Sequence, residues 1–119
     1  MLGKLFLSLK DNLIAKGLPE DKISTFESYL IGKNRKLLFP EVISRDFGLS
    51  YQQAQSLLMF LSTQKLTTRV YRIDLPEDNT FIDYYNVFEI PSEIEFSNEV
   101  IPTEDRTYLL FKGAYNGNR

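Results

Sequence analysis

The chain has 119 residues, of which 43% are hydrophobic and 25% are charged, values typical of a single folded domain. It contains no cysteine and no histidine, which excludes disulfide bonds, thiol nucleophiles and the most common metal ligand. Its apolar stretches are far shorter than the roughly 20 residues that a membrane span needs. We therefore expect a cytoplasmic protein that does not cross a membrane.

The net charge of −2 conceals a strong segregation along the chain. Residues 1–32 carry no net charge, residues 33–72 carry +5 and residues 73–119 carry −7. The basic segment is either a surface that binds phosphate groups or an ordinary solvated surface. The acidic segment either keeps the protein soluble or shields the basic one.

The N-terminal part of the chain predicts two helices. Over residues 1–16 apolar side chains recur every three or four positions, and Gly17 and Pro19 end this pattern. A second helix is expected over residues 20–32, with acidic residues in its first turn. The apolar stripe of the first helix belongs either to the core or to the seam of a homodimer; it consists of Leu2, Leu5, Phe6, Leu9 and Leu13.

The next part of the chain predicts two helices joined by a tight turn. Pro40 opens the first of them, which runs to Phe47, and Gly48 begins the turn. Ser50 and Gln53 have the spacing of a capping box, so the second helix is expected to begin at Ser50 and to end near Lys65. Its buried stripe is expected to consist of Ala54, Leu57, Leu58 and Leu61.

Beyond Thr67 the apolar period changes to two, which predicts a hairpin. Its strands are expected over residues 69–75 and 80–88, on either side of a turn at residues 76–79. The hairpin aromatic residues could stack on single-stranded bases, but they are expected to pack on the helices and on the last strand; they are Tyr71, Phe81, Tyr84, Tyr85 and Phe88. Further along, the sequence predicts mostly loop at 94–102, a strand at 107–112 and a frayed tail at 113–119.

This order of elements resembles the winged helix-turn-helix superfamily of bacterial type over about residues 35–90. The residues that carry the resemblance are Gly48 in the turn, then Leu49, Ala54, Leu58, Leu61 and Leu66. The sequence departs from the pattern at Lys65, where bacterial members commonly have glycine. The resemblance implies an α+β fold in one domain. A winged helix-turn-helix at 33–90 would follow two helices at 1–32 and precede an acidic C-terminal β extension at 91–119.

The resemblance favours a small DNA-binding protein, a transcriptional regulator, with double-stranded DNA as its partner. Outward-facing residues of the helix after the turn would then read base edges, and basic residues around it would neutralise phosphates. The first set is Tyr51, Gln52, Gln55, Ser56 and Met59, and the second is Arg45, Lys65, Arg69 and Arg72.

The alternative is a protein-interaction module, an adaptor or subunit of a larger and possibly defence-associated bacterial complex. The outward face of the helix carries no Arg or Lys before Lys65, and the hairpin turn contains Glu77 and Asp78. Such an uncharged surface with Tyr, Gln and Met suits protein contacts. No phosphate-binding glycine loop and no nucleophile motif is present, so we expect neither an enzyme nor a cofactor or metal site.

Overall fold

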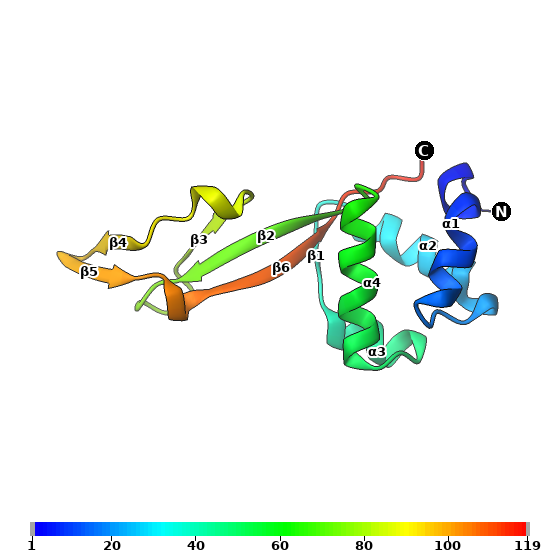
Figure 1. Ribbon diagram of the computed structural model, residues 1–119, viewed down its shortest axis with the longest axis horizontal. Helices are drawn as coiled ribbons and strands as arrows, with labels where there is room; N and C mark the ends of the chain where they lie inside the picture. The colour runs from blue at the N-terminus through cyan, green and yellow to red at the C-terminus, as the bar shows by residue number, and fades with distance from the viewer. Residues whose placement is uncertain (1, 119) are drawn as a thin grey trace. The chain divides into compact units, whose positions relative to one another are not determined.

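The computed structural model describes residues 2–118 and has a mixed α+β architecture (Figure 1). Its helices, in chain order, are α1 (Lys4–Ala15), the short 3-10 helix η1 (Glu20–Lys22), α2 (Ile23–Gly32), α3 (Pro40–Phe47), α4 (Tyr51–Thr63), η2 (Val87–Glu89) and η3 (Glu104–Arg106). Its strands are β1 (Leu37–Leu38), β2 (Thr67–Asp74), β3 (Phe81–Tyr84), β4 (Glu93–Phe96), β5 (Glu99–Pro102) and β6 (Thr107–Gly113). Four strands form one sheet in the order β1-β6-β2-β3, and β4 and β5 form a separate antiparallel hairpin.

The chain divides into two compact units. We call residues 1–68 with 111–119 the helical unit, and residues 69–110 the strand unit. The boundaries expected at residues 32 and 90 do not coincide with this division, which falls inside β2 and β6. The helical unit has eleven basic and six acidic residues, whereas the strand unit has three basic and ten acidic residues. The net charges of the two units are therefore +5 and −7.

The core of the helical unit is built from one apolar stripe on each of its long helices. On α1 the buried residues are Phe6, Leu9 and Leu13, while Leu2 and Leu5 are partly buried and pack against the core. The stripes of α2 and α4 contribute Ile23, Phe26, Leu30, Ala54, Leu57, Leu58 and Leu61, and α3 adds Ile43 and Phe47. The stripe of α1 thus lies in the core of its own chain.

The tail of the chain is anchored, so the prediction of a frayed segment was wrong over its described part, which ends at residue 118. The Tyr115 side chain is fully buried, and its ring stacks on Phe6 with 5.4 Å between the ring centroids. Its hydroxyl donates a hydrogen bond of 2.8 Å to Glu27 Oε2, which also accepts one of 3.1 Å from the Gly3 amide. One carboxylate thus ties both ends of the chain to α2.

The predicted turn between α3 and α4 is confirmed. Gly48 has φ 71° and ψ 31°, a left-handed conformation that favours glycine, and Leu49 is buried. The Gln53 amide donates to Ser50 Oγ at 3.0 Å, and the Ser50 amide donates to Gln53 Oε1 at 2.9 Å. This capping box satisfies two backbone donors where α4 begins.

The end of α4 keeps the usual backbone geometry despite the departure at Lys65. That residue has φ 60°, the conformation in which glycine is most common at this position. Its amide donates to Ser62 O at 3.1 Å, and the Leu66 amide donates to Leu61 O at 2.9 Å. These two hydrogen bonds form a Schellman motif, with lysine in the place of glycine.

The strand unit differs from the prediction at two places. Strand β3 ends at Tyr84 instead of continuing to residue 88, because the chain turns there into η2. Residues expected to be mostly loop form the hairpin β4–β5, whose tip residues Ser97 and Asn98 have φ 52° and 66°. A two-residue loop with positive φ at both positions suits the twist of a hairpin.

The last predicted strand is confirmed as β6, which lies between β1 and β2 in the sheet. Its end pairs with β1 through Leu37 opposite Lys112 and Leu38 opposite Phe111. No helix in residues 2–118 has both the length and the apolar character that crossing a membrane requires.

Candidate functional site

The face of α4 that points away from the core is the first candidate surface. We call Tyr51, Gln52, Gln55, Ser56 and Met59 the α4 face; all five are exposed, as their helical spacing predicted. Tyr51 and Met59 are the large apolar members, with 49% and 39% of their surface exposed. The α4 face therefore combines amide, hydroxyl and apolar groups and carries no charged side chain.

One basic residue that the sequence analysis did not include lies beside the α4 face. Lys16 Nζ donates a hydrogen bond of 3.4 Å to Ser56 Oγ and lies 5.9 Å from the centre of the Phe60 ring. Lys16 follows α1 directly, so its contact with α4 joins residues 40 positions apart. No local pattern predicts such a contact.

Arg45, on α3, is paired with its neighbour. Its Nε lies 2.9 Å from Asp46 Oδ1, and this hydrogen bond raises the pKa of the Arg45 guanidinium. The two charges offset each other, which weakens Arg45 as a ligand for phosphate. Lys65 and Arg69, the next two residues expected around the helix, are both exposed.

Arg72 is held more firmly than Arg45. Its Nε and Nη2 donate hydrogen bonds of 2.8 and 3.1 Å to the two carboxylate oxygens of Asp83, which lies opposite it on β3. Its guanidinium lies 3.7 Å from the centre of the Phe81 ring, and only 16% of its side chain is exposed. The hydrogen bonding of its guanidinium to the Asp83 carboxylate also raises the pKa of Arg72. Through these contacts Arg72 stabilises the pairing of β2 with β3.

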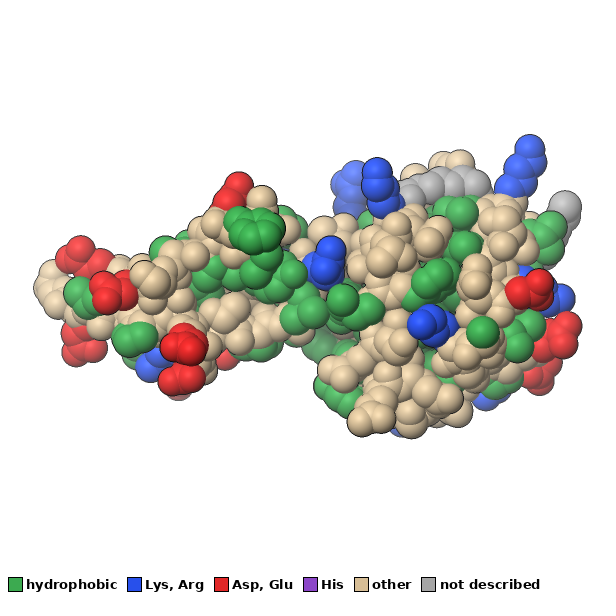
Figure 2. Space-filling view, in the orientation of Figure 1, with side chains coloured by type: hydrophobic (Ala, Val, Ile, Leu, Met, Phe, Trp, Pro, Cys, Tyr) green, Lys and Arg blue, Asp and Glu red, His purple; other side chains and the backbone are tan. Residues whose placement is uncertain are grey.

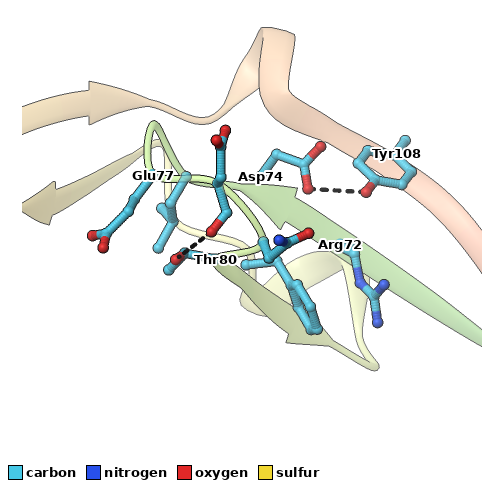
Figure 3. Close-up of a pocket in the computed structure, with 9 residues that line it drawn as sticks. Arg72, Asp74, Glu77, Thr80 and Tyr108 are labelled. Atoms are coloured by element: carbon cyan, nitrogen blue, oxygen red, sulfur yellow. Dashed lines mark hydrogen bonds between the residues drawn. The ribbon is translucent and has the colours of Figure 1, made fainter.

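A shallow depression of about 390 Å³ lies at the turn between β2 and β3 (Figure 3). It is lined by Arg72, Asp74, Leu75, Glu77, Asp78, Asn79, Thr80, Phe81 and Tyr108. Tyr108 donates a hydrogen bond of 2.9 Å to Asp74, and burial, followed by this hydrogen bond, raises the pKa of the phenol.

The acidic side chains at this depression do not converge on one point. In Figure 3 the Asp74 carboxylate points toward Tyr108, whereas Glu77 points away from both. In the described part of the chain there is no group of three or more acidic residues that could hold a metal ion. The depression is therefore a polar surface feature without the geometry of a metal site.

Several aromatic residues of the strand unit are exposed, so the prediction that they pack inside the protein was wrong for these. Phe81 has 45%, Tyr85 has 56% and Phe88 has 93% of its surface exposed. Tyr71 and Tyr84 are partly buried. Figure 2 shows exposed hydrophobic side chains over β3 and η2, and acidic side chains around the β4–β5 hairpin. The strand unit thus presents both apolar and acidic groups to solvent.

Comparison of the chain with family models, with curated proteins and with solved structures gave no match in any of the three.

Proposed function

We propose that the chain is a non-enzymatic protein-interaction module in which α3, α4 and the β2–β3 hairpin form a winged helix-turn-helix. The observation that carries the proposal is the uncharged α4 face, with Tyr51 and Met59 as its exposed apolar groups. Tyr and Met are enriched at protein interfaces, and Met adapts its shape to a partner surface. A phosphate backbone would find no cation among the five residues of this face.

Two arginines of the predicted phosphate-binding set add support. Arg45 and Arg72, which would neutralise phosphates in a DNA complex, already share their charges with Asp46 and Asp83. The β2–β3 hairpin, which would approach the duplex as the wing, belongs to a unit with a net charge of −7. Because like charges repel, this unit opposes contact with DNA.

DNA binding is the second candidate. It is favoured by the +5 charge of the helical unit and by the exposed amides of Gln52 and Gln55, which could pair with adenine. Lys16, beside Ser56, would contribute a cation to this side of α4.

The proposal predicts that charges placed on the α4 face remove a protein partner. We would compare affinity purifications from the native cells, using the wild-type chain and the double variant Tyr51→Glu with Met59→Glu as baits. The partner should be lost with the variant, because burying two carboxylates at an interface is costly. The double variant Leu7→Glu with Ile14→Glu, on exposed positions of α1, is the matched control and should retain it.

A binding titration with a fluorescent random-sequence duplex separates the two candidates. The proposal predicts no binding at about 200 mM salt and no steep salt dependence between about 50 and about 200 mM. Tight binding that falls steeply with salt, and that Gln52→Ala with Gln55→Ala abolishes, would establish the second candidate instead.

A further inference from the structure

Helix η2 holds an almost fully exposed phenylalanine in an ordered turn. Phe88 has 93% of its surface exposed, the largest fraction among the exposed large apolar residues within residues 2–118. Its amide donates a hydrogen bond of 3.0 Å to Asn86 Oδ1, and the Glu89 amide donates one of 3.0 Å to Asn86 O. The local backbone is therefore fixed by its own hydrogen bonds, while the ring projects into solvent.

Phe88 is accompanied by other exposed apolar residues. Tyr85 and Val87 have 56% and 47% of their surfaces exposed, and with Phe88 they form what we call the η2 knob. Single exposed apolar residues are common, but a cluster of large ones on an ordered turn marks an interaction site. An ordered aromatic side chain loses little conformational entropy on binding, so it is well suited to anchor a contact.

The net charge of the strand unit, to which the η2 knob belongs, restricts the chemistry of the partner. The strand unit has ten acidic residues, and Glu89 directly follows Phe88. Of its three arginines, Arg72 is paired with Asp83, Arg106 donates a hydrogen bond of 3.4 Å to Asp74 O, and Arg69 is exposed. Nucleic acid and anionic lipid would be repelled, whereas a basic protein surface would be attracted.

We infer that the η2 knob is an anchor that inserts into an apolar socket, rimmed by Lys or Arg, on a different protein. The inference rests on the proposed function in that it requires a protein partner, but it places a second contact on the strand unit, separate from the α4 face. Such a chain would bridge two protein surfaces, as an adaptor does.

Site-specific photo-crosslinking tests the inference in the native cells. A benzoyl-phenylalanine placed at position 88 should give a dominant covalent adduct with one other protein, identified by mass spectrometry. The same photoreactive residue at position 7 is the control, since Leu7 is 61% exposed and lies in the helical unit. Position 88 should give the adduct, and position 7 should not.

The purified partner then provides a quantitative test. Phe88→Ala should weaken its binding by about 30-fold or more, the loss typical of an interface anchor. Glu89→Lys should also weaken binding of the partner, and this loss should be larger at low salt than at high salt. The charge reversal Asp11→Lys on α1 should leave the affinity unchanged.

Each other outcome overturns the inference. The inference is contradicted if adducts at position 88 are no more abundant than those at position 7. It is also contradicted if the adducts at position 88 form with nucleic acid, lipid or a second copy of this chain. Unchanged affinity of Phe88→Ala for the crosslinked protein would contradict it as well. A crosslinker at position 59 reports on the proposed function separately: adducts at 59 without adducts at 88 would leave the α4 contact standing and remove only the η2 knob.

Discussion

Glu27 is a buried carboxylate in the apolar stripe of α2, with 7% of its surface exposed. Its spacing from Ile23 and Leu30 places it on their face of the helix, so the sequence contained a signal that an acidic residue is buried there. The partners of this carboxylate, Gly3 and Tyr115, lie 24 and 88 positions away in the chain. Local patterns cannot predict contacts at such separations, which is why the tail was expected to fray.

The Glu27–Tyr115 hydrogen bond should contribute measurably to stability. Tyr115→Phe keeps the ring stacked on Phe6 but removes the phenolic donor from a buried carboxylate. We expect the free energy of unfolding to fall by about 1–3 kcal/mol, measured by urea titration of the far-UV circular dichroism. Tyr51→Phe, at an exposed position, should change it by less than about 0.5 kcal/mol. Equal effects of the two substitutions would contradict the role of Glu27.

At the scale of elements, α4 was the most predictable part of the chain. Its capping box, the turn at Gly48 and its buried stripe all depend on residues within one or two helical turns of each other. Because these signals are local, the exposed residues of the α4 face also follow from the sequence. Lys16, which comes from another helix, does not.

The four-residue strands β3, β4 and β5 were harder to predict because they are short. Glu93–Phe96 does alternate polar and apolar residues, but it contains only four residues, and its hairpin turns at Ser-Asn instead of the commoner Asn-Gly. The aromatic run after β3 favours a strand by composition. Asn86 ends the extended conformation, because its side-chain oxygen accepts a hydrogen bond from the Phe88 amide and thereby stabilises a turn.

The end of α4 offers a test at the scale of the element. Lys65 has φ 60°, which glycine adopts without steric strain. We expect Lys65→Gly to raise the free energy of unfolding by about 0.5–1 kcal/mol, measured by thermal or urea unfolding. Lys65→Ala removes the same side chain without relieving the backbone, so it should give no gain. A gain from alanine equal to that from glycine would show that the lysine side chain, and not the backbone, is responsible.

At the scale of the whole molecule, charge divides between two units. The sequence predicted a basic middle and an acidic end, and the two units carry the same net charges of +5 and −7. Their membership differs, however, because Arg69 and Arg72 belong to the strand unit and Lys112 to the helical unit. The boundary between the two units crosses β2 and β6, so each of these strands belongs partly to both units. Dividing the sequence into consecutive segments cannot reproduce such a boundary.

The α4 face and the η2 knob lie on different units. The α4 face belongs to the basic helical unit, and the η2 knob belongs to the acidic strand unit. Partners with different charges would suit them, which is consistent with an adaptor that joins two proteins.

Photo-crosslinking at position 59 shows whether the α4 face binds a protein. Met59 lies within the α4 face with 39% of its surface exposed, so a benzoyl-phenylalanine there would touch whatever α4 contacts in the native cells. If the α4 face binds a protein, the covalent adduct forms with a protein and is absent when Tyr51→Glu is added. Adducts with double-stranded DNA, and none with protein, would contradict protein binding by the α4 face.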